Sequence, residues 1–415
     1  MENKIVVPFS PPDISDAEIN EVADALRSGW ITTGPKTKQL EKTLAGYVGV
    51  SDVTPGCVCL NSQTACGEIS LRLLGIGPQE GGSEKDEVIC PAYTYTASAS
   101  VVCHVGAKLV LVDCAKDNPN IDYDALEAAI TENTKAIIPV DIGGVPCDYD
   151  KIFEILERKK HLFRPSNEIQ KAIGRVAVVE DAAHALGAYY KGNPIGSIAD
   201  FTNFSFHAVK NFTTAEGGAL VWKTIDGVSD EEIYHKIQLY SLHGQSKDAL
   251  SKNKPGMWEY DIIGTYYKCN MTDMAAALGL AQYKRYPAML KRRKEIVEKY
   301  DSAFKPLGVQ TLDHYNAEHA GSGHLYMVRI PWADDNVRRE IITKMGEQGI
   351  ACNVHYKPLP MHTAYKNLGF DINDFPNAYA FYQNEITLPL HTKLTDEQVD
   401  YVIKTFCKII NEYAR

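Results

Sequence analysis

The 415-residue sequence lacks an excess of positive charge and any long apolar run. It carries 43 Lys and Arg against 53 Asp and Glu, a formal net charge of −10. Without a basic excess to neutralise phosphates, we do not expect a nucleic-acid binder. The most basic stretch, residues 284–294, is short and fits the solvated face of a helix. No apolar run approaches the roughly 20 residues that span a bilayer, and Pro8, Pro11 and Pro12 interrupt any signal peptide, so we expect a cytoplasmic protein without a membrane partner.

The sequence also has no C-x-x-C pair among its ten cysteines. They are scattered from Cys57 to Cys407, which argues against a disulfide framework and against a zinc site. Cys57 and Cys59 stand in an apolar stretch where strand alternation would turn both side chains to one face. We therefore expect buried, reduced thiols and no metal.

Short β-type runs alternate with helical patterns over the first two-thirds of the chain. Continuous Val, Ile and Leu strands separated by helices predict an α/β fold with a parallel sheet covered on both faces. In such sheets ligands bind beyond the carboxyl ends of the strands. The predicted strands lie at residues 57–60, 87–91, 108–113, 136–140, 176–180, 201–206 and 218–222.

The length predicts two domains, or one large domain with an appendage. Residues 242–264 are rich in Gly, Ser and Lys and predict a mobile loop between two parts of the chain. We place a large domain at residues 1–255, with an N-terminal arm at 1–14, and a small α+β domain at 256–415. The small domain is expected to open on a long helix at 272–300 and to end on a helix at 396–413.

Three features fall at the ends of predicted strands. Asp181 ends the strand VAVVE and either faces a ligand or caps the following helix. The segment FSFHAVKNFTTAEGGAL places Lys210 in a loop, where a lysine is usually solvated, and its Gly217-Gly218 pair permits a tight reversal. The segment NSQTA, residues 61–65, precedes a helix and either binds an anion or only caps that helix.

Together, the three features match what pyridoxal phosphate (PLP) requires. A lysine amine forms a Schiff base with this cofactor, a carboxylate keeps its pyridine nitrogen protonated, and a phosphate cradle holds it. An aromatic side chain should cover the ring face. Tyr93 and Tyr95, in PAYTYTASAS, directly follow a predicted strand and could supply it.

Nearly the whole chain resembles the DegT/DnrJ/EryC1/StrS sugar aminotransferases. The resemblance rests on GWITTGPKTKQLEKTLAGYVG, PAYTYTAS, EDAAHALGA, FSFHAVKNFTTAEGGAL, NMTDMAAALGLAQ and GIACNVHYKPLP, and on the 29-residue step from Asp181 to Lys210. It implies a fold-type-I PLP enzyme, with a mainly parallel seven-stranded sheet in a large domain and a smaller α+β C-terminal domain.

The resemblance also implies roles for the residues around the cofactor ring. Lys210 would form the Schiff base and move the proton, and Asp181 would pair with the pyridine nitrogen. His184 stands near the ring hydroxyl and Tyr95 stacks on the ring. The phosphate-binding positions are Ser205, Thr64, Ala65 and Gln63, where Gln63 replaces a commoner glycine.

Other matching residues concern the substrate and the oligomer. Asn270 matches a residue that reaches the phosphate of a neighbouring subunit, which implies a homodimer with shared active sites. The substrate-binding positions are His355, Thr33 and His207.

The implied reaction moves an amino group from L-glutamate, released as 2-oxoglutarate, to a nucleotide-linked 4-keto-6-deoxy sugar. His184, His207 and the KCNMTD segment around Asn270 are closer to the 4-aminotransferases, among which the UDP-4-amino-4-deoxy-L-arabinose enzyme compares best. The alternatives are amination of a 3-keto sugar or a non-sugar ketone, and a PLP-binding regulatory protein without turnover. Arg329, Lys357 or Lys268 could supply positive charge for the nucleotide.

Overall fold

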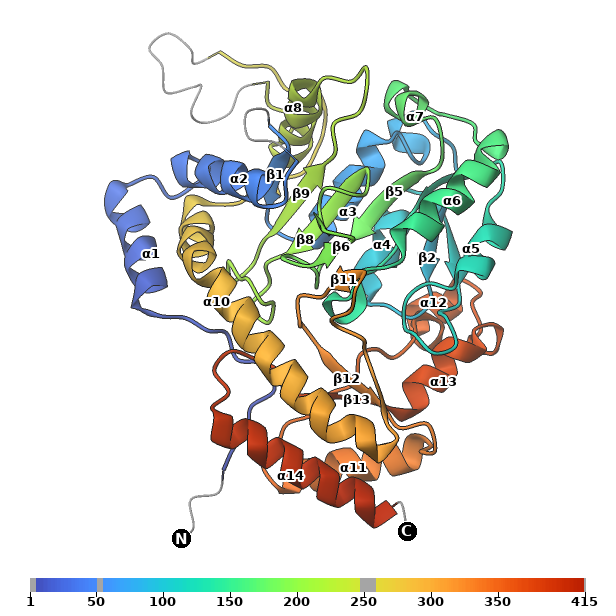
Figure 1. The fold of residues 1–415 in the computed structure, drawn as a ribbon. Helices are drawn as coiled ribbons and strands as arrows, with labels where there is room; N and C mark the ends of the chain where they lie inside the picture. The colour runs from blue at the N-terminus through green and yellow to red at the C-terminus, as the bar shows by residue number, and fades with distance from the viewer. Residues whose placement is uncertain (1–4, 51–54, 247–258, 414–415) are drawn as a thin grey trace.

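The computed structural model describes residues 5–50, 55–246 and 259–413 and contains a central seven-stranded sheet (Figure 1). Five neighbouring strands run parallel, whereas β9 runs antiparallel to both of its neighbours. The predicted α/β fold with a mainly parallel seven-stranded sheet is therefore confirmed. In spatial order the strands are β1 (Cys57–Leu60), β9 (Gly218–Trp222), β8 (Phe201–Ser205), β5 (Ala177–Asp181), β4 (Thr134–Ile137), β2 (Glu87–Pro91) and β3 (Lys108–Val112).

Helices cover both faces of this sheet and form one apolar core on each. Strand alternation divides neighbouring side chains between the cores, because Val58 and Leu60 lie in one while Cys57 and Cys59 lie in the other. The two cysteines share a face, as predicted. One face carries α3 (Gln63–Leu73), α4 (Thr96–His104), α7 (Glu168–Ile173) and α8 (Asp230–Ser241), and the other carries α2 (Pro35–Tyr47), α5 (Tyr123–Ala129) and α6 (Tyr149–Lys159).

A third core lies in the C-terminal part of the chain. Its sheet has the order β10 (Gln310–Thr311), β12 (Tyr326–Arg329) and β13 (Glu385–Leu388). Two helices that pack on each other, α11 (Asp335–Glu347) and α14 (Asp396–Tyr413), contribute to this core. Smaller elements include α12 (Thr363–Asn367), α13 (Pro376–Asn384), and a small sheet of β6 (Tyr189–Tyr190), β7 (Asn193–Pro194) and β11 (His319–Ala320).

The long helix α10 (Asp273–Phe304) belongs to two cores, as its diagonal course in Figure 1 illustrates. Leu280 and Met289 lie in one core of the large sheet, whereas Ile296 and Phe304 lie in the third core. Helix α1 (Asp16–Ser28) packs along α10 and begins with a capping box in which Ser15 and Glu18 bond reciprocally.

The domain division at residues 255 and 256 stays a prediction, because this boundary and most of the predicted mobile loop lie outside the described residues. The described part of the N-terminal arm packs with the C-terminal part. Val7 forms a parallel bridge with Ile350 and is buried in the third core.

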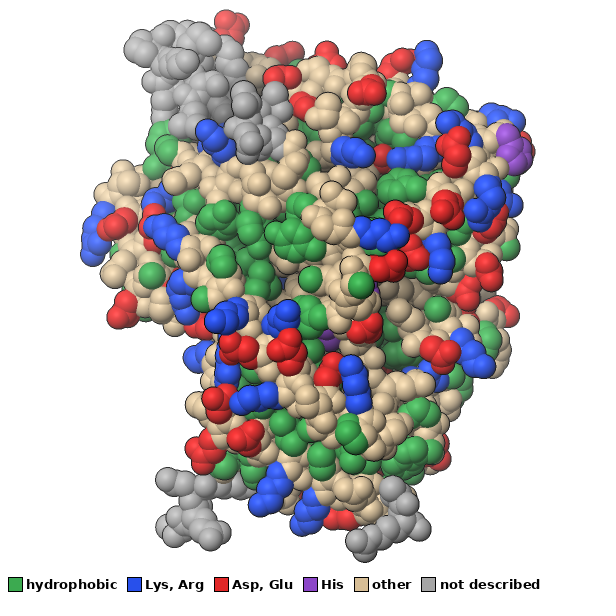
Figure 2. All heavy atoms as spheres, in the orientation of Figure 1, with side chains coloured by type: hydrophobic (Ala, Val, Ile, Leu, Met, Phe, Trp, Pro, Cys, Tyr) green, Lys and Arg blue, Asp and Glu red, His purple; other side chains and the backbone are tan. Residues whose placement is uncertain are grey.

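Among the described residues, none of the helices has the length and apolar character required to cross a membrane. On the face shown in Figure 2, basic and acidic side chains are interspersed. The same described residues contain no group of three or more His, Cys, Asp or Glu placed to hold a metal ion.

Candidate active site

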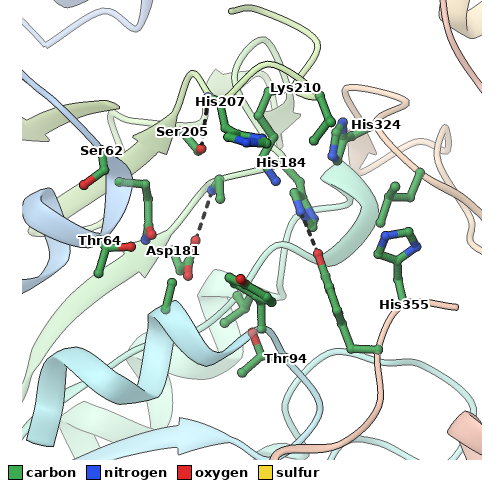
Figure 3. Close-up of a pocket in the computed structure, with 18 of the residues that line it drawn as sticks. Ser62, Thr64, Thr94, Asp181, His184, Ser205, His207, Lys210, His324 and His355 are labelled. Atoms are coloured by element: carbon green, nitrogen blue, oxygen red, sulfur yellow. Dashed lines mark hydrogen bonds between the residues drawn. The ribbon is translucent and has the colours of Figure 1, made fainter. Parts of the chain in front are cut away.

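A cavity of about 400 Å³ lies at the carboxyl edge of the large sheet, against residues of the C-terminal part. This size suits a small-molecule ligand. Strands β5 and β8 end beside it, so the loops that follow them deliver side chains into the same space (Figure 3). Nine predicted site residues line the cavity: Lys210, Asp181, His184, Tyr95, Ser205, Thr64, Gln63, His355 and His207.

Lys210 lies in the tight loop between β8 and β9. The loop is closed by backbone bonds from Lys210 N to His207 O (2.9 Å) and from Thr214 N to Phe206 O (2.9 Å). Burial lowers the pKa of the Lys210 amine to about 8, and the negative charge of Asp181 opposes this shift. A larger share of the amine is therefore neutral and nucleophilic near neutral pH than for an exposed lysine.

Asp181 ends β5 and is buried at the cavity wall. Ser98 Oγ donates to its Oδ2 at 2.6 Å and Ala183 N–H donates to its Oδ1 at 3.1 Å. Burial raises the pKa of the Asp181 carboxyl, whereas these two donors and Lys210 favour its charged form. The carboxylate is thus held in a fixed orientation with a cation across the cavity.

His184 is held in one tautomer by its neighbours. Gly143 N–H donates to Nδ1 at 3.2 Å, so the proton of the neutral ring is on Nε2 and faces Tyr356 Oη at 3.1 Å. Burial lowers the pKa of His184 well below its usual value, and the charges of Lys210 and His355 act in the same direction. The ring is therefore neutral, and it leaves the Tyr356 hydroxyl proton free for a ligand.

The N-terminus of α3 forms one end of the cavity. Ser62 caps this helix by accepting from Ala65 N–H at 3.2 Å, which uses the backbone donor of Ala65. The preceding N–H groups of Gln63 and Thr64 have no acceptor within the helix. Gly218 lets β9 pass closely, since a β-carbon there would lie 2.5 Å from Gln63 N. The left-handed residue of the Lys210 loop is Ala215 (φ 67°), so Gly218 serves close approach rather than the reversal we expected.

The other predicted lining residues differ in exposure. Tyr95 is 60% exposed at the cavity mouth and lies 6.0 Å, centroid to centroid, from Tyr356. Ser205 Oγ accepts from His207 N at 3.4 Å, and the exposed His207 ring lies 3.6 Å from Glu216. Phe9 stacks on the His355 ring at 5.7 Å.

Three predicted site residues do not line this cavity. Ala65 packs against a core of the large sheet, and its N–H donates to Ser62 Oγ. Asn270 lies in a separate surface depression, where its amide donates to Thr33 Oγ1. Thr33 in turn donates to Met271 O at 2.6 Å.

Sequence reasoning missed three residues of the site. Tyr356 and Ser98 stand inside the quoted segments GIACNVHYKPLP and PAYTYTASAS, so their neighbours His355 and Tyr95 were the signal. His324 had no such signal. Its ring lies 4.4 Å from that of His184, and its Nδ1 is 2.9 Å from Asn211 Oδ1.

The residues present fit a phosphorylated pyridine aldehyde. Lys210 makes no hydrogen bond or ion pair with any described side chain, and its amine is free for an aldehyde. Asp181 faces the same space, and the helix N-terminus is suited to an anion. This fold and this site define a fold-type-I aminotransferase.

Comparison with known proteins agrees with this class. A sequence model of the DegT/DnrJ/EryC1/StrS aminotransferase family matches residues 12–407. The chain belongs to this family, and the predicted enzyme class is confirmed.

Several relatives are similar over nearly their whole length. Spr1654 of Streptococcus pneumoniae is assigned as a sugar aminotransferase and has been solved in PMP, apo and PLP forms. Its PMP form is 57% identical to this chain, with a TM-score of 0.93 over 98% of this chain and 99% of that one. SpsC of Bacillus subtilis, a spore coat polysaccharide biosynthesis protein, is 39% identical over 97% of both chains. PseC of Helicobacter pylori, an aminotransferase of pseudaminic acid biosynthesis, is 26% identical, with a TM-score of 0.82 over 98% of this chain and all of that one. The predicted cofactor, PLP, agrees with the PLP and PMP forms of Spr1654.

Proposed function

We propose that this protein uses PLP to move an amino group from L-glutamate to a nucleotide-linked 4-keto-6-deoxy sugar, giving a 4-amino sugar for surface polysaccharide or glycan synthesis. The observation that carries the proposal is the meeting of Lys210, Asp181 and the α3 N-terminus around one cavity. The role of SpsC in polysaccharide biosynthesis and of PseC in pseudaminic acid biosynthesis supports a sugar as the acceptor.

When bound, PLP supplies an electron sink that weakens a bond at the amino-bearing carbon. Asp181 would favour the protonated pyridine nitrogen, because it is a buried carboxylate held by Ser98 and Ala183. Free N–H groups at the start of α3, with Thr64 and Ser205, would hold the phosphate. Tyr95 at the mouth would cover the ring.

Lys210 would move the proton in both half-reactions. Its Nζ would take up a proton from the amino-bearing carbon of the donor and release it again in the same half-reaction, and it would do the reverse for the sugar. A pKa of about 8 suits this double role, since Nζ can both accept and release a proton near neutral pH. The neutral His324, His355 and Tyr356 line the opposite side and can contact sugar hydroxyl groups.

The preference for a 4-keto sugar rests on motif likeness to the 4-aminotransferases, including the UDP-4-amino-4-deoxy-L-arabinose enzyme. His184 and His207 carry that likeness, and both line the cavity. The two alternatives, a 3-keto sugar and a non-sugar ketone, are separated by testing which ketone regenerates the original cofactor form.

The proposed assembly is a homodimer with shared active sites. Asn270 lies outside the cavity of its own chain, beside an apolar depression that includes Ile19, Val22 and Leu278. Among the described lining residues Lys210 is the only Lys or Arg. The three cations suggested from the sequence lie elsewhere, with Arg329 bonded to Asn384 and Lys116, Lys357 in a separate depression, and Lys268 against Asn270. A second copy could add positive charge for the nucleotide.

The test is the absorbance spectrum of the PLP-loaded protein before and after L-glutamate. We expect the band of the Lys210-bound cofactor to disappear and the band of its aminated form to appear. Adding UDP-, dTDP- and GDP-linked 4-keto sugars should then reverse the change for one of them. A spectrum that does not change when glutamate is added contradicts the assignment of glutamate as the donor. If only a 3-keto sugar reverses the spectral change, the 4-keto assignment is wrong.

A further inference from the structure

A buried carboxyl lies behind His355 and is not part of the cavity. Glu385, the first residue of β13, is fully buried. Its Oε1 lies within hydrogen-bond distance of Thr387 Oγ1, and its Oε2 accepts from His355 N–H at 2.9 Å. Thr387 Oγ1 in turn lies 2.9 Å from His355 Nδ1. Glu385, Thr387 and the His355 ring therefore form one continuous chain of hydrogen bonds, which ends at the cavity.

The His355 ring is fixed on several sides. Asn353 and Thr387 exchange two backbone bonds of 2.8 and 3.0 Å, which fasten this segment to β13. Tyr93 Oη donates to His355 O at 2.7 Å, and Phe9 stacks on the ring. With Nδ1 turned to Thr387, Nε2 points the other way and has no hydrogen-bond partner in the part of the chain that the structure describes.

The protons shared along these hydrogen bonds link the protonation of Glu385 to the position of the proton on the His355 ring. When Glu385 is ionised, Thr387 must donate its single proton to the carboxylate, so it accepts from Nδ1–H and Nε2 carries a lone pair. When Glu385 is protonated, it donates to Thr387, Thr387 donates to Nδ1, and the ring proton moves to Nε2. His355 thus presents either an acceptor or a donor to the cavity.

We propose that Glu385, acting through Thr387, sets which nitrogen of His355 carries the ring proton, and so which hydrogen-bonding role Nε2 offers to the substrate. Glu385 and Thr387 are positioning residues for His355 in this scheme. The consequence for the sugar rests on the proposed function, whereas the position of the ring proton does not.

The charges around Glu385 allow both states to form. Arg338 on α11 is the cation that favours the ionised form, and burial outweighs it, raising the pKa of Glu385 to about 8. Tyr93, Cys352 and Tyr356 also face Glu385, and each has its pKa raised by burial, so none adds a charge near neutral pH. Burial lowers the pKa of His355 to about 4, so its ring stays neutral while Glu385 titrates. Nε2 should be a donor below about pH 8 and an acceptor above it.

The test is long-range ¹H–¹⁵N NMR of the PLP-loaded protein labelled with ¹⁵N-histidine, with His355 assigned by its loss in His355→Gln. In the native protein we expect the ring proton on Nε2 at pH 6.5 and on Nδ1 at pH 9.5. Glu385→Gln has the same shape, and its amide donates to Thr387 at every pH, so it should hold the proton on Nε2 at both pH values.

Two matched variants test the link at Thr387. Thr387→Ser keeps the hydroxyl and should retain the pH-dependent shift, whereas Thr387→Val removes it and should abolish the dependence. The proposal is overturned if the His355 ring proton lies on Nδ1 in Glu385→Gln. It is also overturned if the position of that proton changes with pH in Thr387→Val as it does in the native protein. If the ring proton lies on Nδ1 at both pH values in the native protein and on Nε2 in Glu385→Gln, the proposal is supported. Glu385 is then ionised over the whole pH range tested.

The substrate consequence has its own readout. If Nε2–H donates to the sugar, the native protein should lose this hydrogen bond as the pH rises, whereas Glu385→Gln should keep it. The ratio of kcat/KM for the sugar half-reaction, native protein over Glu385→Gln, should therefore fall about tenfold from pH 7 to pH 9.5. No amino transfer to any keto sugar, combined with the expected NMR result, would contradict the proposed function and leave the role of Glu385 standing.

Discussion

The two walls of the cavity differ in charge. The wall formed by the large sheet carries Asp181 and Lys210, two groups of opposite sign. The wall from the C-terminal part carries His324, His355 and Tyr356, which are neutral near pH 7. The charged wall is suited to a charged, covalently held ring, and the neutral wall to the hydroxyl groups of a sugar.

Burial is the main cause of the neutral wall, and the Lys210 cation adds to its effect on the histidines. Asp181 raises the pKa of Lys210 while Lys210 favours the Asp181 carboxylate, so each supports the charge of the other. Burial is the main cause that lowers the pKa of His184 and His355, and the positive charge of Lys210 lowers both further. A cation beside buried imidazoles therefore keeps them uncharged.

The largest effect should come from removing the cation. Lys210→Ala should abolish the band of the covalently held cofactor and reduce amino transfer to background, because no other amine lines the described cavity. Spectroscopy and turnover measure the two losses. Lys223→Ala, at an exposed lysine, is the control and should behave as the native protein. A Lys210→Ala protein with the native band and rate would refute the site assignment.

Removing the anion should have the next largest effect. Asp181→Asn keeps the shape but takes away the charge that favours a protonated pyridine nitrogen, so kcat of the glutamate half-reaction should fall on the order of 10²–10³-fold. Stopped-flow absorbance measures this rate. The conservative Asp181→Glu should retain more activity than Asn, and equal rates for Asp181→Asn and the native protein would exclude an electrostatic role.

The charge coupling also predicts a pH dependence. PLP uptake by the cofactor-free protein requires the neutral Lys210 amine, so its rate should rise about tenfold from pH 6 to pH 7 and level off above pH 8. Because Asp181 raises the pKa of Lys210, Asp181→Asn should shift the midpoint to lower pH. A midpoint near 10 in the native protein would show that burial does not perturb this amine.

The smallest effect is expected on the neutral wall. Tyr356→Phe removes one hydroxyl that His184 leaves free to donate, which costs about 0.5–1.5 kcal/mol, or roughly 2- to 13-fold in kcat/KM for the sugar. The glutamate half-reaction should change less than the sugar half-reaction. Tyr379→Phe, at an exposed tyrosine, serves as the matched control. An equal loss in both half-reactions would assign Tyr356 to the cofactor instead.

The walls also differ in how far the sequence predicts them. Asp181 and Lys210 could be predicted because they follow strands whose ends meet at one edge and because their spacing resembles that of the family, and β1, β2 and β9 have the predicted bounds. The neutral wall depends on how residues 324–356 pack against that edge, which no local pattern specifies. His324 was missed for this reason, whereas Tyr356 was missed although it directly follows the predicted His355 in the motif GIACNVHYKPLP. Short strands such as β6, β10 and β11 were missed because two residues show no periodicity.

The shared helix α10 has a consequence for folding. Its 32 residues supply apolar side chains first to a core of the large sheet and then to the third core. Melting either core would expose a face of the same helix and weaken the other core. We therefore expect one cooperative unfolding transition, and we expect neither half to remain folded when expressed by itself.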